Sequence, residues 1–103
     1  MKSMKIKENE IYSIKLMGGE ELIARVISQD EKYFYLKAPL GVMMTNNGLQ
    51  LIPALFTSVE NPEEVAVLIT AVAMISETRD DVKEAYEKSI SPIVQPNKQI
   101  LTG

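Results

Sequence analysis

Two short runs of alternating apolar residues, joined by Gly18 and Gly19, constrain this chain more than any other feature of its sequence. A period of two places alternate side chains on one face of a β-strand. The alternating residues are Tyr12, Ile14 and Leu16 in the first run and Leu22, Ala24 and Val26 in the second. A glycine pair supplies the positive φ angles of a tight turn. The sequence therefore predicts a β-hairpin between residues 11–17 and 21–29, with a core on one face.

A third strand is predicted over residues 32–38, after the polar segment 28–31. Aromatic or apolar side chains occupy both of its faces. Either Phe34 and Leu36 or Tyr33 and Tyr35 point into the core, because a slip of one residue exchanges the two faces. The pattern leaves both registers open.

A second hairpin is predicted around Asn47 and Gly48, because Asn-Gly is a strong signal for a two-residue turn. Pro39 and Gly41 bend the strand that leads to it, and the return strand covers residues 49–56. Pro53 lies within that return strand and has no N–H to donate to a neighbour. It indicates either a bulge or a position on an unpaired edge of the sheet.

Residues 65–75 form the longest apolar run, and Val, Ile and Thr dominate it. This β-branched content favours one strand that is covered on both faces, with another subunit as the simplest second cover. A helix is predicted next, over residues 78–90. Thr78 is its expected N-cap, and Asp80 and Asp81 stand where carboxylates favour the helix dipole.

The 103 residues fit a single domain. Its predicted parts are a polar N-terminal segment (1–10), barrel strands (11–76), the helix (78–90) and a tail (91–103). The tail contains two prolines but also Ile93, Val94, Ile100 and Leu101. It is too apolar for a purely solvated segment, and we expect it to dock on the sheet or on a neighbour.

The chain contains no Cys, His or Trp, which removes thiolate and imidazole ligands and every nucleophile–histidine arrangement. We therefore expect no enzyme, no catalytic residue, no metal site and no cofactor. Residues 1–10 are charged and unlike a signal peptide, and the run 65–75 is too short to span a membrane. An intracellular protein without a membrane segment is expected. Its net charge is −3, and its second half is acidic.

The segment 14–26, followed by Asp30, resembles the first sequence motif of the Sm-like family. Gly19, Leu22, Val26 and Asp30 match that motif in register, whereas Ala24 stands where the family prefers glycine. The resemblance covers residues 11–38 by motif and 48–76 by strand order. The acidic composition and the C-terminal helix resemble the Sm-like proteins of marine tailed phages. The implied fold is mostly β, a small and strongly bent five-stranded barrel with a C-terminal α-helix.

The resemblance further implies a homo-oligomeric ring of about five to seven copies, in which the fourth strand of one copy pairs with the fifth strand of the next. In this chain those strands correspond to residues 49–56 and 65–75. The expected interface residues are Leu51, Ile52, Leu55, Phe56, Val67, Ile69 and Val72.

Family members that bind RNA use an Asn just after the motif Asp, a stacking side chain, and an Arg-Gly pair between strands four and five. Here Asp30 is present, Lys32 stands at the stacking position, and Phe34 replaces the Asn. No Arg or Gly occurs between residues 49 and 78. Asp30, Lys32 and Phe34 are therefore either an altered RNA site or a turn aspartate, a solvated lysine and a core phenylalanine.

We expect a non-enzymatic ring that serves as a binding scaffold, with RNA as a candidate ligand outside the usual uridine pocket. The alternative is a structural or assembly adaptor of a phage particle without a nucleic-acid role. The acidic charge and the lost Asn and Arg-Gly favour this alternative. A phage-encoded protein would act in the host cytoplasm.

Overall fold

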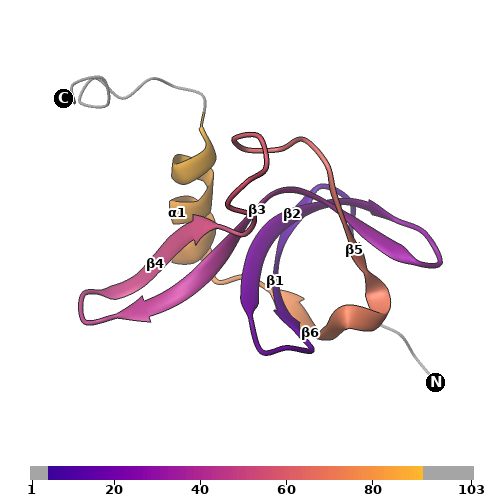
Figure 1. The fold of residues 1–103 in the computed structure, drawn as a ribbon, viewed down its shortest axis with the longest axis horizontal. Helices are drawn as coiled ribbons and strands as arrows, with labels where there is room; N and C mark the ends of the chain where they lie inside the picture. Colours follow the sequence, from indigo (N-terminus) through magenta and orange to yellow (C-terminus); the bar gives the residue numbers. More distant parts are fainter. Residues whose placement is uncertain (1–4, 92–103) are drawn as a thin grey trace.

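The fold is that of a computed structural model, which describes residues 5–91. Strands dominate it, and one α-helix follows them at the C-terminal end (Figure 1). The elements in chain order are β1 (Glu10–Leu16), β2 (Glu21–Gln29), β3 (Tyr33–Thr45), β4 (Gly48–Pro53), β5 (Val65–Leu68), the 3-10 helix η1 (Ile69–Ala71), β6 (Val72–Glu77) and α1 (Asp80–Ile90).

One antiparallel sheet contains all six strands, in the order β4-β3-β2-β1-β6, with β5 added beside β3. The long strand β3 serves both partners, because its residues 33–36 pair with β5 and its residues 40–45 pair with β4. Between these halves Ala38 has a φ of 45°, in the left-handed region, and Pro39 follows it. The strongly bent, mostly β architecture with a C-terminal helix confirms the fold that the sequence predicts (Figure 1).

Both predicted hairpins are present. Gly19 adopts a φ of 102° in the turn between β1 and β2, where its N–H donates to the Leu16 carbonyl at 2.9 Å. Gly48 adopts a φ of 104° after the second turn, in which the Asn47 N–H donates to the Thr45 hydroxyl at 3.1 Å. Glycine reaches these angles without steric cost, so the two turns set the register of their strands.

The inner face of the bent sheet holds the first core cluster. Phe34 and Leu36 point into it, whereas Tyr33 and Tyr35 face outwards and are half-buried, which decides the open register of β3. Ala24 is fully buried where the pairing of β2 with β3 shifts, so a small side chain stands at the bend as expected. The cluster consists of Tyr12, Ile14, Leu22, Ala24, Val26, Phe34 and Leu36.

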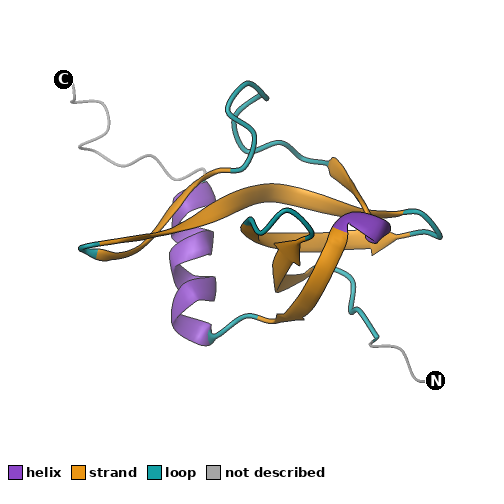
Figure 2. Cartoon of the chain, turned by 60° about the horizontal axis from the view of Figure 1, so that its bottom comes forward, coloured by secondary structure: helices purple, strands orange, loops and turns teal. Residues whose placement is uncertain are grey.

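A second core lies on the opposite face of the sheet, under α1 (Figure 2). Tyr86 of the helix is fully buried there against Ile11, Ile23 and Leu40. Its hydroxyl donates to the Lys37 carbonyl at 2.6 Å and accepts the Arg25 N–H at 3.2 Å. The helix therefore closes the outer face of the barrel, and the sheet centre is covered on both sides within one chain.

The prediction of one continuous strand over residues 65–75 is wrong. The run is divided into β5, η1 and β6, because β5 pairs with β3 whereas β6 pairs with β1. The chain must turn at η1 to pass from one partner to the other. Within residues 5–91 only one face of β5 is covered, since Val65 and Val67 are half-buried while Ala66 and Leu68 are exposed.

Two predicted boundaries are also wrong. The return strand ends at Pro53 rather than at residue 56, because the chain leaves β3 there and forms a loop over residues 54–64. Arg79, not Thr78, is the N-cap of α1, and it makes no side-chain capping bond. The Thr78 hydroxyl is buried and bonded to the Ser13 hydroxyl at 2.8 Å instead. Asp80 and Asp81 do lie in the first turn, as expected.

Candidate functional site

The two ends of the sheet are the most distinctive feature of the surface. Within residues 5–91, β4 pairs only with β3, and β6 pairs only with β1. Each of these strands therefore has an outer edge whose N–H and C=O groups pair with no other strand of the described chain. Such edges are templates for a strand from another molecule unless something blocks them.

The hydrogen-bonding direction of β4 follows from its pairing with β3. The Ala54 N–H donates to the Pro39 carbonyl at 3.2 Å, and bonded and non-bonded pairs alternate along an antiparallel ladder. Leu49, Leu51 and Pro53 consequently direct their backbone groups away from β3, towards the open edge. Pro53 has no N–H, so it needs no partner there. The position on an unpaired edge is thus the alternative that the structure supports for Pro53.

Large apolar side chains are exposed on both edge strands. Leu49 on β4 is 42% exposed and Met74 on β6 is 67% exposed. Neither residue is among the interface residues expected from the sequence, where the run 65–75 is interpreted as one strand. In β6 the pairing with β1 shifts by one residue after Val72, so Val72 and Ile75 both contact the first core while Met74 faces away from it, and simple alternation from Val72 does not predict this.

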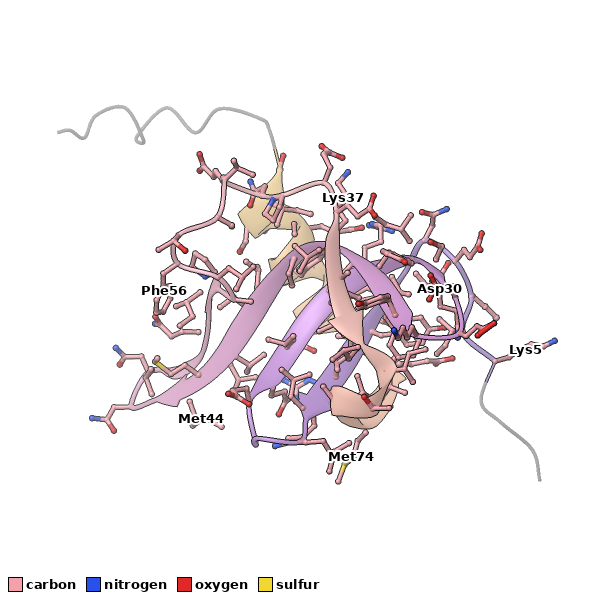
Figure 3. All side chains as sticks on the ribbon, turned by 45° about the vertical axis from the view of Figure 1, so that its right-hand side comes forward. Lys5, Asp30, Lys37, Met44, Phe56 and Met74 are labelled. Carbon is pink, nitrogen blue, oxygen red and sulfur yellow. The ribbon has the colours of Figure 1, made fainter. Side chains whose placement is uncertain are left out.

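The seven expected interface residues fall into three groups. Val67, Ile69 and Val72 pack against the first core, and Leu51 packs against the second core, so most of these side chains serve the barrel itself. Ile52 is half-buried at the bend, opposite Gly41. Leu55 and Phe56 are 50% and 80% exposed, and they lie in the loop after β4 rather than in a strand. Figure 3 shows Phe56 and Met74 at well-separated positions on the surface.

Asp30 organises the turn between β2 and β3. Its Oδ1 accepts the N–H groups of Lys32 and Tyr33 at 2.8 Å each, and its Oδ2 accepts the Tyr35 hydroxyl at 2.6 Å. The hydrogen bond from Tyr35, followed by the two backbone bonds, lowers the pKa of the Asp30 carboxyl. The same bond raises the pKa of Tyr35 to about 12. Both carboxylate oxygens of Asp30 are therefore engaged in hydrogen bonds within its own turn.

The other two residues of the expected RNA site, Lys32 and Phe34, have surroundings different from those of Asp30. Phe34 is only 6% exposed, because its ring belongs to the first core. Lys32 is exposed at the turn. Its carbonyl accepts the Ile69 N–H at 2.9 Å, and this bond links η1 to the start of β3. The aromatic rings that do face outwards here are those of Tyr33 and Tyr35, whose centroids lie 6.0 Å apart at an interplanar angle of 45°.

The surroundings of this turn are acidic rather than basic. Glu31, Glu63 and Glu64 are exposed, and the Lys37 ammonium lies 3.9 Å from the Glu63 carboxylate. Recognition of phosphate backbones relies on clustered cations with free charge. The arrangement around Asp30 therefore provides little attraction for a polyanion.

Comparison with known proteins adds no relative: neither a protein-family model nor a curated protein matches this chain. Within residues 5–91, no three His, Cys, Asp or Glu side chains come together where they could bind a metal ion. The described part of the chain also contains no helix with the length and apolar character needed to cross a membrane.

Proposed function

We propose that this chain is a non-enzymatic, Sm-like building block of a homo-oligomeric ring that serves as a binding scaffold. The observation that carries the proposal is the pair of open edges, β4 and β6, at opposite ends of the sheet. Pairing β4 of one copy with β6 of the next satisfies these two edges in every copy, and it leaves the outer edge of β5, which pairs only with β3 within residues 5–91, beside the contact. Such a heterologous contact forms a closed ring when the rotation between copies closes.

The sequence resemblance and the fold support the same arrangement. The resemblance implies pairing between strands four and five of neighbouring copies, which correspond to β4 and β6 once the run 65–75 is divided as observed. Leu49 and Met74 add exposed apolar surface to these edges. About five to seven copies are expected from the resemblance.

We infer that the assembled ring binds protein rather than RNA, as a structural or assembly adaptor would. Asp30 is engaged by three hydrogen bonds within its turn, and Phe34 is in the core, so neither is available to hold a base. Fluorescence anisotropy with U-rich and A-rich oligonucleotides at two salt concentrations tests this preference. Binding that weakens as salt rises would establish RNA as the ligand instead.

The ring is tested by light scattering coupled to size exclusion. We expect a multimeric mass for the natural chain and a monomeric mass for Met74→Glu, which places a charge on the β6 edge. Met17→Glu is the matched control, because Met17 is equally exposed (69% against 67%) but lies in the turn between β1 and β2. A natural chain that is monomeric at about 10 μM, well above the Kd of a stable complex, would refute the ring.

A further inference from the structure

An apolar groove lies beside the second core, between the bend of the sheet and the loop over residues 54–64. Its volume is about 380 Å³. Pro39, Leu40 and Leu51 line it on the side of the sheet. Leu55, Phe56 and Val59 stand along the loop side, and they are 50%, 80% and 74% exposed. Three large apolar side chains exposed within one short loop form a patch of the kind that usually has a partner.

The described chain ends at the mouth of this groove. A second recess shares Ala38 and Asn61 with the groove and is also lined by Ile90 and Ser91, so the two are adjacent. Ser89, in the last turn of α1, lines the groove itself. Ser91 leaves the helix in an extended conformation, with φ −65° and ψ 136°. The described chain therefore ends beside the groove.

The sequence that follows Ser91 has an uncharged, partly apolar composition that suits an apolar groove. Residues 92–97 carry no charge and include Ile93 and Val94, and Lys98 is the only charged residue of the segment 92–103. Three extended residues span about 10 Å, and the recess and the groove adjoin at Ala38 and Asn61. Glu60 and Glu63 line the groove and the recess, so the nearby charges are opposite in sign to Lys98.

We propose that Ile93 and Val94 occupy this groove in their own chain and cover Leu55, Phe56 and Val59. This proposal is independent of the ring, which uses the outer edges of β4 and β6. It gives the exposed side chains of Leu55 and Phe56 a partner within the chain, in place of the subunit contact expected from the sequence.

The chain contains no cysteine, so every disulfide bridge, within one chain or between two, must join introduced residues. The test pair is Val94→Cys with Leu55→Cys, and the control pair is Val94→Cys with Met17→Cys, in a comparably exposed turn. A bridge requires Cβ atoms within about 4.5 Å. We expect the test pair to close within one chain roughly ten-fold faster than the control pair, because docking raises the effective concentration.

Mass spectrometry and non-reducing gels separate the outcomes. Equal rates for both pairs would overturn the proposal, and bridges between two chains would assign the groove to the tail of another copy or to a second copy. Both pairs are measured in the Met74→Glu background as well, so that failure of this docking is distinguished from failure of the ring.

A second measurement uses dye fluorescence on the full chain. Val94→Asp should increase the fluorescence of a dye that binds exposed apolar surface by about two-fold or more, because the groove is uncovered. Leu101→Asp, outside the docked residues, is the control and should leave the fluorescence unchanged. An equal response from both variants would contradict docking at Val94.

Discussion

The hydroxyl of Tyr86, in α1, donates a hydrogen bond to the carbonyl oxygen of Lys37, 2.6 Å away at the bend of β3. This bond joins the helix to the point where the long strand changes its partner from β5 to β4. Burial raises the pKa of the Tyr86 phenol, which therefore stays a neutral donor. A single side chain thus couples the outer core to the curvature of the sheet.

Removing this hydroxyl should destabilise the fold without opening a large cavity. Tyr86→Phe leaves the Lys37 carbonyl and the Arg25 N–H without their partner, and we expect the free energy of unfolding to fall by about 1–3 kcal/mol. Tyr86→Ala also empties the core and should cost about 3–5 kcal/mol. Urea unfolding followed by circular dichroism measures both. Glu84→Gln, exposed on the same helix, is the control and should change stability by less than about 0.5 kcal/mol.

Tyr35→Phe should raise the pKa of the Asp30 carboxyl towards its ordinary value, because the hydrogen bond from Tyr35 is the main cause of the lowered pKa. Carboxyl titration by carbon-13 NMR measures this shift. Asp81 is an internal control, since the Arg79 guanidinium lowers the pKa of that carboxyl by a separate hydrogen bond. Equal movement of both carboxyl groups, or none at Asp30, would contradict the assignment.

The same turn predicts how stability depends on pH. Because the pKa of Asp30 is lower in the folded than in the unfolded chain, its stabilising effect is complete well above about pH 4 and is lost as pH falls through the folded value. Asp30→Asn should therefore reduce the free energy of unfolding at neutral pH, and the difference from the natural chain should shrink in acid. A difference that stays constant from pH 7 to pH 2 would show that charge plays no part.

The hydrogen bond between Ser13 and Thr78 should behave as a coupled pair. Thr78→Val keeps the shape of the side chain but leaves the Ser13 hydroxyl unpaired, and we expect a loss of about 1 kcal/mol. Ser13→Ala should cost a similar amount. In a double-mutant cycle the combined variant should cost less than the sum of the two, by about 0.5 kcal/mol or more. Strict additivity would mean that the bond contributes nothing to stability.

Local signals in the sequence account for most of the fold. The turns at Gly19 and Gly48 were predictable because their residues suit positive φ, and the alternation around Ile14 identified the inner core. The second core was not predicted, although Ile11 and Ile23 supply apolar side chains on the opposite face. Its existence depends on where α1 packs, and that is decided by long-range contacts rather than by the periodicity of one strand.

The features that differ from the sequence-based expectation have a tertiary origin. No Gly or Pro marks the corner at η1 within the β-branched run 65–75. The corner forms because β5 and β6 pair with two different strands. Thr78 has the residue type of an N-cap, but its hydroxyl is used by Ser13. For the candidate site, Pro53 indicated either a bulge or an unpaired edge, and the pairing of β4 with β3 alone supports the edge. The exposure of Met74 depends on where β6 begins and on the shift in its pairing with β1.

Replacing glycine by alanine at three positions should separate backbone strain from crowding. Gly19 and Gly48 have φ angles of 102° and 104° with open space around an added Cβ, so any cost comes from the backbone alone. We expect each substitution to lower the free energy of unfolding by about 1–3 kcal/mol. Gly41→Ala is the matched control, because its φ is not in that region and its Cβ would meet Ile52 at an ordinary 3.6 Å. Thermal unfolding should rank Gly41→Ala as the most stable of the three, and a larger loss there than at Gly19 would contradict the assignment of strain to the turns.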